Sequence, residues 1–455
     1  MYSRSLLCTV LLLSSGVFGA EVEPWERPVK FGLDTYLALR HLGTELGSSI
    51  KPTSSDRTNY LDAAQELGVT VIRDDLLSWD EIQPEKDGPY DFSFLDDLVR
   101  KSSARGIDVL SMVYFLPPWA TVGENHPWSY PHDPRYKLPM RKSEASFRRF
   151  LHAAVERYCG CGPASLVLKI PVRSYVFMNE PEGYANEILT PDEYAHWLRI
   201  FSEEIRAVDP GIRVVAPALA APGAWDGNYL RGQFLDRLLD SKELRGPGWP
   251  YFDVVDYHPY PVGYGPEHDL YGIDVATSYV RGVLARHGLS MPLWITELGD
   301  NSTDEAVQAD HVVEYAIHAA TQGVERVYIF GMADYGKERW GLLEDTPSEQ
   351  PPVRKPSFVA YKTLLAKISD NQRVEFLGPG RYCVFRNGKP PVYVLWSTGE
   401  TASVQYFLRG ALSVTDLTGH TKIIEAEHLA LDKHPILVEL ETDPGHGVSD
   451  TRVQK

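Results

Sequence analysis

The chain of 455 residues contains eight short apolar runs, separated by longer segments with helical periodicity. The runs are rich in Val, Ile and Tyr and apolar at consecutive positions, which is typical of parallel strands buried on both faces. They are VKFGLDTY, VTVIRDDL, DVLSMVYF, SYVFMNEP, RVVAPALA, FDVVDYHPY, PLWITELG and RVYIFGMAD. The intervening segments, such as 93–106, 191–211 and 304–323, end at a glycine, a common helix stop. Strand followed by helix, eight times over, predicts a closed (β/α)₈ TIM barrel.

An open, doubly wound sheet is the main alternative for such an alternation. It would normally have fewer strands, and one that binds a dinucleotide carries a glycine fingerprint after its first strand. No G-x-G-x-x-G follows the first run at 29–36. The barrel is therefore favoured, and we assign residues 21–368 to it.

The sequence changes character after residue 368. Short strand-like runs divided by Gly, Asn and Pro follow, with Asn387-Gly388 as a clear hairpin signal. They are RVEFLG, RYCVFRNGKPPVYVLWS, ASVQYFL, LSVTDLTG and HPILVEL. We expect a small C-terminal antiparallel β-sandwich domain over residues 369–443 and a flexible tail over 444–455.

The first twenty residues resemble an export signal. Arg4 precedes the apolar stretch LLCTVLLL, and small residues follow up to Gly19 and Ala20, where cleavage is expected. The apolar stretch is too short to span a bilayer comfortably, although an uncleaved anchor remains the alternative. The sequence thus predicts a secreted or periplasmic protein without a membrane span.

The formal net charge of -17 excludes one class of partner. An acidic surface repels a polyphosphate, and no Lys/Arg run interrupts it, so nucleic acid is not an expected partner.

The cysteines predict no disulfide framework. Cys8 leaves with the signal, and an odd number remains: Cys159, Cys161 and Cys383. With one residue between Cys159 and Cys161, a bridge there is expected to be strained and is disfavoured, and a zinc site from so few ligands is weak. At least one buried free thiol is expected.

Two glutamates directly follow apolar runs. Glu180 closes the fourth run and Glu297 the seventh. In a (β/α)₈ barrel the carboxyl ends of the strands form the face that carries the reacting groups, and strands four and seven lie across the barrel from one another. A single loop glutamate is more often a salt-bridged rim residue. Two carboxylates placed after buried strands, where an unpaired charge is costly, indicate function.

Paired carboxylates across a cleft suit the cleavage of a glycosidic bond. One group protonates the leaving oxygen, and the other attacks the sugar or activates water.

Four motifs together resemble glycoside hydrolase clan A, the retaining β/α-barrel glycosidases. They are MNEP on the fourth run, ITELG on the seventh, Arg73 in VIRDD on the second and DYHPY on the sixth. Within the clan the chain is similar to families thirty-nine and five, and the WGLLEDTPSEQPPVRKPSFVAYKTLL segment before a β domain favours the first. The resemblance covers roughly residues 30 to 440.

The resemblance implies roles for three residues. Glu180 would be the general acid/base, Glu297 the nucleophile, and Asn179 a hydrogen-bond partner of the sugar 2-hydroxyl. The two carboxyl groups of a retaining enzyme lie about 5 Å apart and act through a covalent glycosyl-enzyme intermediate.

The same resemblance implies the support of the nucleophile. Arg73 would keep Glu297 ionised, and Tyr260 or His258 would orient it. Such chemistry needs no metal and no organic cofactor.

The chain departs from the clan at the eighth run. Clan members often have a Trp at the end of this strand as the floor of the sugar site, whereas this chain has YIFGMADYG. Phe330 or the nearby Trp340 would take its place, which leaves the shape of that subsite open.

Aromatic residues in the loops are further candidates for sugar binding. Trp119 and Trp128 lie in the long segment after the third run, and Trp225 follows the fifth. Each could stack on a sugar, but packing of the loop on the barrel is equally compatible with the sequence.

Charged loop residues give weaker signals. His126 and His132 lack a carboxylate at a spacing useful for a metal. A set of cations could recognise a uronic acid, although solvated surface charge is the commoner role: Arg141, Lys142, Lys337 and Arg339.

The sequence therefore predicts a secreted retaining glycoside hydrolase that acts on a poly- or oligosaccharide. Two alternatives stay open: a catalytically silent carbohydrate-binding barrel, and a transglycosidase that uses the same two glutamates. The sugar, its linkage, exo or endo action and the oligomeric state are not encoded in any of these motifs.

Overall fold

The computed structural model describes most of the chain. The described residues are 28–38, 52–121, 138–183, 189–220, 222, 233–261, 270–334, 338–347, 349–398, 404–406, 410–426 and 429–440. The predicted export signal at 1–20 and the predicted tail at 444–455 lie outside these ranges.

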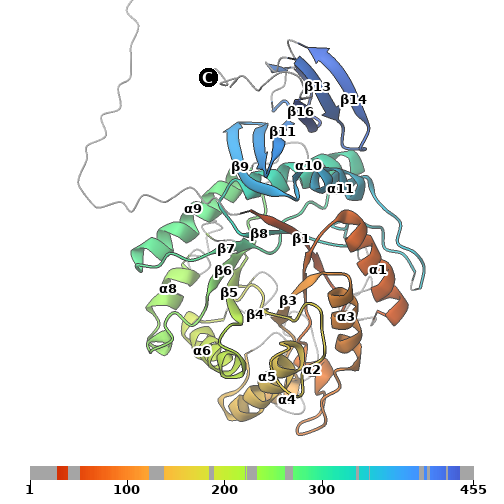
Figure 1. Cartoon of the computed structure of the whole chain (residues 1–455). Helices are drawn as coiled ribbons and strands as arrows, with labels where there is room; N and C mark the ends of the chain where they lie inside the picture. The colour runs from red at the N-terminus through yellow and green to blue at the C-terminus, as the bar shows by residue number, and fades with distance from the viewer. Residues whose placement is uncertain are drawn as a thin grey trace, which may run out of the picture.

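Eight parallel strands close into a barrel in which each strand pairs with the next and β8 pairs with β1 (Figure 1). The strands are β1 (Lys30–Thr35), β2 (Val71–Asp74), β3 (Asp108–Val113), β4 (Ser174–Phe177), β5 (Arg213–Leu219), β6 (Val254–Tyr257), β7 (Leu293–Ile295) and β8 (Arg326–Ile329). The TIM barrel predicted from the alternating runs is confirmed.

Helices surround the barrel and connect its strands (Figure 1). They are α1 (Ser54–Leu67), α2 (Trp79–Ile82), α3 (Ser93–Ala104), α4 (Pro118–Thr121), α5 (Glu144–Tyr158), α6 (Pro191–Val208), α8 (Phe234–Asp240), α9 (Tyr271–Arg286), α10 (Glu305–Ala320) and α11 (Pro356–Ile368), with the 3₁₀ turns η2 (Arg141–Ser143) and η3 (Lys242–Leu244). Across the described part of the chain, no helix combines the length and apolar character that crossing a bilayer requires.

Helix ends follow local chemistry. At the start of α1 the Thr53 hydroxyl accepts a hydrogen bond from the Asp56 N–H, and the Asp56 carboxylate accepts one from the Thr53 N–H. This capping box satisfies two backbone groups that the helix leaves without partners. Gly68, with φ 85°, ends the helix in the left-handed conformation that glycine adopts most readily.

The period of two along each strand divides the barrel core into two layers of side chains. Val71 points into the barrel, and its neighbour Ile72 packs outward against the helices. The interior cluster is Val71, Leu110, Met112, Val176, Val215, Ala218, Val254, Trp294 and Tyr328. These residues fill the barrel, so polar groups can converge only beyond them, at the carboxyl ends of the strands.

The opposite end of the barrel is closed by a cationic and aromatic cluster. The Arg326 guanidinium lies 4.1 Å from the ring centroid of Trp294, and the Trp294 Nε1–H donates to Glu325 at 3.2 Å. Arg213 donates to the same carboxylate at 2.9 Å. These contacts stabilise the end that is remote from the predicted site.

The C-terminal domain is a six-stranded antiparallel sheet in the order β14-β13-β16-β11-β10-β9, accompanied by a two-stranded sheet of β12 and β15. The strands are β9 (Asn371–Gly378), β10 (Arg381–Arg386), β11 (Lys389–Leu395), β12 (Val404–Tyr406), β13 (Gly410–Thr415), β14 (Thr421–Ala426), β15 (Leu429–Leu431) and β16 (Ile436–Leu440). Asn387-Gly388 forms the hairpin between β10 and β11. Leu429 and Leu431 of the small sheet share an apolar cluster with Leu395, Leu412, Val414 and Val438 of the large one, so two layers are present.

The β domain packs beside α10 and α11 (Figure 1). The Asn371 side chain bonds to both the N–H and the carbonyl of Val29 at 2.9 Å, directly before β1. The His318 Nδ1 on α10 lies 3.0 Å from the hydroxyl of Tyr382 on β10. These buried polar contacts tie the domain to the barrel.

The cysteines contradict one sequence expectation. Cys159 and Cys161 form a disulfide, although a bridge across one residue was disfavoured. Gly160 between them has φ 65°, and the resulting turn brings the two Cα atoms to 5.2 Å, within the ordinary disulfide range. Cys383 on β10 is the buried free thiol that was expected, and burial raises its pKa to about 12.

Candidate active site

Polar side chains converge at the carboxyl ends of the strands. Arg73 lies two residues after the inward-pointing Val71, so it points into the barrel as well. By the same period, Asp34 on β1 and Asp256 on β6 lie at this end, and all three side chains are almost fully buried. The apolar interior thus ends in a layer of charge.

Glu180 is held by an unusual backbone segment after β4. Met178 has φ 60° and Glu180 has φ 45°, values that residues other than glycine rarely adopt. The Glu180 N–H donates to the carbonyl of Ala218 at 2.8 Å, which fixes this turn against β5. Strained positions of this kind concentrate at functional sites.

Glu297 follows β7 and accepts two hydrogen bonds. The Arg73 Nη1 donates to its Oε1 at 2.6 Å, and the Tyr260 hydroxyl donates to its Oε2 at 3.1 Å. Burial alone would raise the pKa of Glu297, but the positive charges of His258 and Arg73 outweigh it and hold the pKa below its ordinary value. The carboxylate is therefore ionised near neutral pH.

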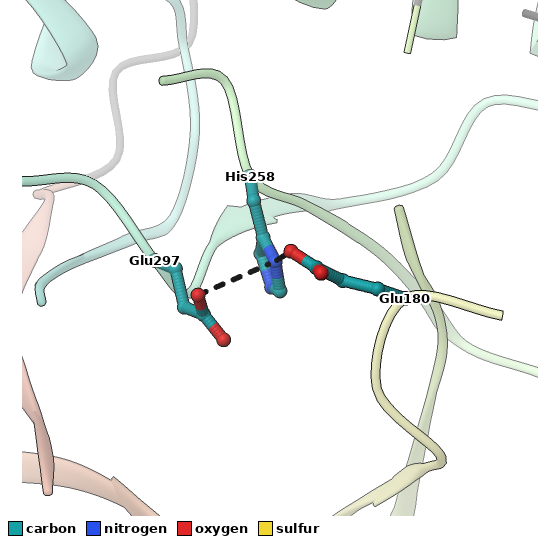
Figure 2. A group of neighbouring side chains, drawn as sticks. All are labelled: Glu180, His258 and Glu297. Atoms are coloured by element: carbon teal, nitrogen blue, oxygen red, sulfur yellow. Dashed lines mark hydrogen bonds and ion pairs between the residues drawn. The ribbon is translucent and has the colours of Figure 1, made fainter. Parts of the chain in front are cut away.

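His258 lies between the two glutamates, as Figure 2 shows. Its Nδ1 is 2.8 Å from the Glu180 Oε1 and 3.7 Å from the Glu297 Oε2. Burial would lower the pKa of His258, but the neighbouring carboxylates Glu297 and Glu180 raise it to about 9. One carboxylate oxygen of Glu180 lies within 4.8 Å of one of Glu297.

Arg73 links several strand ends. Its Nη1 also donates to the Asp34 Oδ2 at 2.6 Å, and its Nη2 donates to the Asn179 Oδ1. Burial raises the pKa of Asp34 well above its usual range, although Arg73 opposes the shift. Asn179, with its carbonyl engaged by Arg73, directs its amide nitrogen elsewhere, where it remains able to donate.

Tyr260, Phe330 and Trp340 form an aromatic group beside Glu297. Ring centroids are 5.6 Å apart for Phe330 and Trp340 and 5.5 Å for Tyr260 and Trp340, in edge-to-face geometry. Tyr36, after β1, contacts Phe330 in the same manner at 5.9 Å. Phe330 is buried and Trp340 half-buried, so both residues proposed for the clan's missing Trp lie in this group.

The ends of β7 and β8 approach so closely that only glycine fits. A Cβ at Gly299 would lie 2.1 Å from the Phe330 carbonyl oxygen, while the Phe330 N–H donates to the Leu298 carbonyl at 3.0 Å.

We expect Gly299→Ala to lower the free energy of unfolding by about 2 kcal/mol or more, because the backbone at residue 299 or at Phe330 must move to make room for the methyl group. Thermal or denaturant unfolding measures this. Gly282→Ala on α9, where the nearest atom is 3.8 Å away, is the control and should be neutral or stabilising. Equal effects of the two substitutions would contradict the steric account.

The predicted loop aromatics have different outcomes. Trp119 on α4 is 8% exposed, contacts Trp79 with centroids 5.0 Å apart, and donates its Nε1–H to the Gln83 carbonyl at 3.3 Å. These contacts favour packing, the alternative that the sequence left open, and the stacking role of Trp119 stays a prediction. Trp128 and Trp225 lie outside the described residues.

The charged loop candidates give little support to uronate recognition. Arg141 and Lys142 are exposed in η2, and the Arg339 Nη1 donates to Asp334 at 3.2 Å. Lys337, His126 and His132 lie outside the described ranges.

Glu180, His258 and Glu297 are also the group whose ligand-type atoms lie close enough to hold a metal ion, among the residues that the structure describes. Two carboxylates and an imidazole suit a divalent ion. However, the raised pKa of His258 favours its protonated form, and the Arg73 guanidinium contacts Glu297. Protonation and a neighbouring positive charge both oppose cation binding, so the site fits proton transfer better than metal binding.

Three residues of the site were not identified by the sequence analysis. Asp34 contacts Arg73, and Asp256 and Thr296 lie behind His258. Each occupies an inward position near the end of a strand, so the period of two could have identified it.

The comparisons with known proteins address the fold. No family model matches the sequence, and no curated protein matches it. Similar solved structures include a family 39 glycoside hydrolase from the gut symbiont Bacteroides cellulosilyticus WH2, with TM-score 0.68, 18% identity and coverage of 92% of this chain and 82% of that chain. A GH39 β-xylosidase from Caulobacter crescentus has TM-score 0.60 and 20% identity, with 92% and 97% coverage. A GH30 endoxylanase from Clostridium papyrosolvens C71 has TM-score 0.57 and 14% identity, with 91% and 97% coverage. The chain therefore shares its fold with clan A glycoside hydrolases of families 39 and 30, and the family 39 neighbourhood that its motifs indicated is confirmed at the level of fold.

Proposed function

We propose that this protein is a retaining glycoside hydrolase in which Glu297 is the nucleophile and Glu180 the general acid/base. The observation that carries the proposal is the carboxylate pair across the barrel, with oxygens within 4.8 Å. Retaining enzymes place their carboxyl groups about 5–5.5 Å apart, whereas inverting enzymes leave about 6.5–9.5 Å for a water molecule. The spacing supports direct attack on the sugar.

The reaction then has two steps. Glu297 attacks the anomeric carbon while Glu180 gives its proton to the leaving oxygen, which forms a glycosyl ester on Glu297. Glu180, now a carboxylate, takes a proton from water, which attacks the same carbon and releases the sugar with its original configuration. The ion pair with Arg73 keeps Glu297 ionised, as a nucleophile must be. The free amide hydrogens of Asn179 would bind the sugar 2-hydroxyl.

The neighbours suggest which substrates to test first. Two of them are named a β-xylosidase and an endoxylanase, so aryl β-xylosides and xylan lead a panel that also contains other neutral and uronic glycosides. We expect the wild-type protein to release sugar whose anomeric configuration, followed by proton NMR during the first minutes, is retained. An inverted product would contradict the mechanism.

The same panel separates the two alternatives. Tight binding without any product would favour a carbohydrate-binding barrel. Products heavier than the substrate, detected by mass spectrometry, would favour a transglycosidase, since a sugar would then replace water as the acceptor.

We also propose that the protein is exported, on the signal-like residues 1–20 alone. The N-terminal mass of protein recovered from the culture fluid or the periplasm tests this, and an intact Met1 would contradict cleavage.

A further inference from the structure

His258 has a second polar contact on the side away from the glutamates. Its Nε2 is 3.1 Å from the Thr296 Oγ1, and the Thr296 hydroxyl donates to the Asp256 carboxylate, with oxygens at 2.7 and 2.8 Å. His258, Thr296 and Asp256 are all 0% exposed. A buried chain of three polar groups therefore ends on the imidazole that contacts Glu180.

The barrel register explains why these groups meet. Asp256 pairs with Trp294 and Tyr257 with Ile295 in the parallel ladder of β6 and β7. Continuing that register places His258 beside Thr296, one residue before the proposed nucleophile. Asp256 and His258 are two residues apart, so both point into the barrel.

Hydrogen counting assigns the proton on the imidazole. A threonine hydroxyl has one hydrogen, and here it goes to the Asp256 carboxylate. The Thr296 oxygen can then only accept from His258, which requires a hydrogen on Nε2. The positive charge on His258 compensates the buried carboxylate of Asp256 on one side and those of Glu180 and Glu297 on the other.

We propose that Thr296, oriented by Asp256, is a positioning residue that keeps Nε2 of His258 protonated, so that Nδ1 is the atom that exchanges a proton with Glu180. This proposal deepens the function proposed above and rests on it for its catalytic meaning. The bond between Nδ1 and Glu180 then holds one hydrogen. A cationic His258 donates it to an ionised Glu180, and a neutral His258 accepts it from a protonated Glu180.

The consequence concerns both steps of the reaction. Glu180 must change its protonation state twice in each turnover. In the first step it takes the hydrogen from Nδ1 and gives it to the leaving oxygen, which leaves His258 neutral with its remaining hydrogen on Nε2. In the second step Glu180 takes a proton from water and can return it to Nδ1, so His258 takes part in both steps without rotating. Without the Thr296 hydroxyl, the neutral imidazole could place its hydrogen on Nδ1 and would then present only a donor to Glu180. The protonated acid would lose its acceptor.

The first test observes the imidazole directly. Protein labelled with ¹⁵N-histidine is titrated from pH 6 to pH 10, and the His258 signals are assigned by their loss in His258→Gln. We expect both ring nitrogens to be protonated at low pH and Nδ1 alone to lose its hydrogen as the pH rises. Loss of the Nε2 hydrogen instead would overturn the proposal. The titration does not depend on turnover, so it tests the position of the imidazole hydrogen even if no glycoside is cleaved.

The second test uses a matched pair of variants. Thr296→Val removes the hydroxyl at nearly constant volume, and Thr296→Ser keeps it. We expect kcat/KM for a glycoside with a poor leaving group to fall about tenfold or more in Thr296→Val, and both the activity and the Nε2-protonated signature to be largely kept in Thr296→Ser. An unchanged tautomer and unchanged activity in Thr296→Val, with a native unfolding temperature, would overturn the role. If Thr296→Val does not fold, the wild-type titration and Thr296→Ser decide the question.

Discussion

Glu297→Ala is expected to lower kcat/KM by about 10⁴-fold or more, since removing a nucleophile eliminates the covalent step on which the rest of the site depends. The fold should survive, because Arg73 still donates hydrogen bonds to Asp34 at 2.6 Å and to Asn179. Steady-state kinetics on the best substrate of the panel, together with a thermal melt, measure both effects.

A glutamate at the other end of the barrel provides the control. Glu325 also pairs with an arginine, Arg213, at 2.9 Å, but it lies below the apolar interior. Glu325→Gln removes a charge of the same kind and should leave kcat/KM within about threefold, as expected for a partly exposed ion pair. Comparable losses in the two variants would indicate a general effect of charge removal and would contradict the nucleophile assignment.

A chemical trap sharpens the same prediction. An activated glycoside that forms the sugar ester quickly but hydrolyses slowly should add the mass of one sugar to the peptide that contains Glu297. Label on a peptide with Glu180 instead would reverse the two roles, because only the nucleophile becomes covalently bound.

The barrel and its paired glutamates could be predicted because their signals are local. A parallel strand buried on both faces is apolar at most consecutive positions, and a carboxylate directly after it stands out within a window of eight residues. Arg73 was found through the resemblance of VIRDD, and the structure brings it to Glu297. The barrel topology then brings these residues together, because closing eight parallel strands places all their carboxyl ends on one face.

Residues inside the strand runs were harder to recognise. Asp34 lies within GLDTY and Asp256 within VVDYH, where a single polar residue is easily taken for the end of a strand. Their burial is explained by hydrogen bonds to Arg73 and Thr296, respectively, and both partners are distant in sequence. Sequence periodicity gives the direction of a side chain but not the charge that it will meet.

Packing and short-range geometry account for what the sequence analysis left undecided or missed. Trp119 was open to either role because its contact with Trp79 depends on how α4 docks on the barrel. The Cys159–Cys161 bridge depends on the left-handed turn at Gly160. Strand β14 was missed because its alternation is weak and its Ile423 is 67% exposed, as an edge strand allows.

Glu180→Ala should have an effect that depends on the leaving group. For a glycoside whose leaving oxygen needs a proton, we expect kcat/KM to fall by about 10²- to 10⁴-fold, the usual contribution of general acid catalysis. For an activated aryl glycoside, whose leaving group departs as a stable anion, the loss in kcat/KM should be within about tenfold. A series of aryl glycosides of graded leaving-group acidity measures the difference as a slope.

A neighbour in the same loop serves as the matched control. Glu182 is fully buried, and its Oε1 accepts from the Ala220 N–H at 2.7 Å. Burial raises the pKa of Glu182 to about 8, so it is mostly neutral at pH 7, and glutamine replaces it with little change in charge. Glu182→Gln should therefore keep the wild-type slope, whereas Glu180→Ala should steepen it.

The second step of the reaction gives an independent check on Glu180. With an activated substrate the alanine variant forms the ester on Glu297 but lacks a base for water, so the ester should accumulate and the first turnover should appear as a burst. A small anion such as azide needs no base, and it should restore turnover and leave a glycosyl azide of retained configuration. Equal losses on all leaving groups, with no rescue by azide, would contradict the acid/base role of Glu180. A loss that depends on the leaving group, with rescue by azide, would separate Glu180 from Glu297, because neither is expected when the nucleophile is removed.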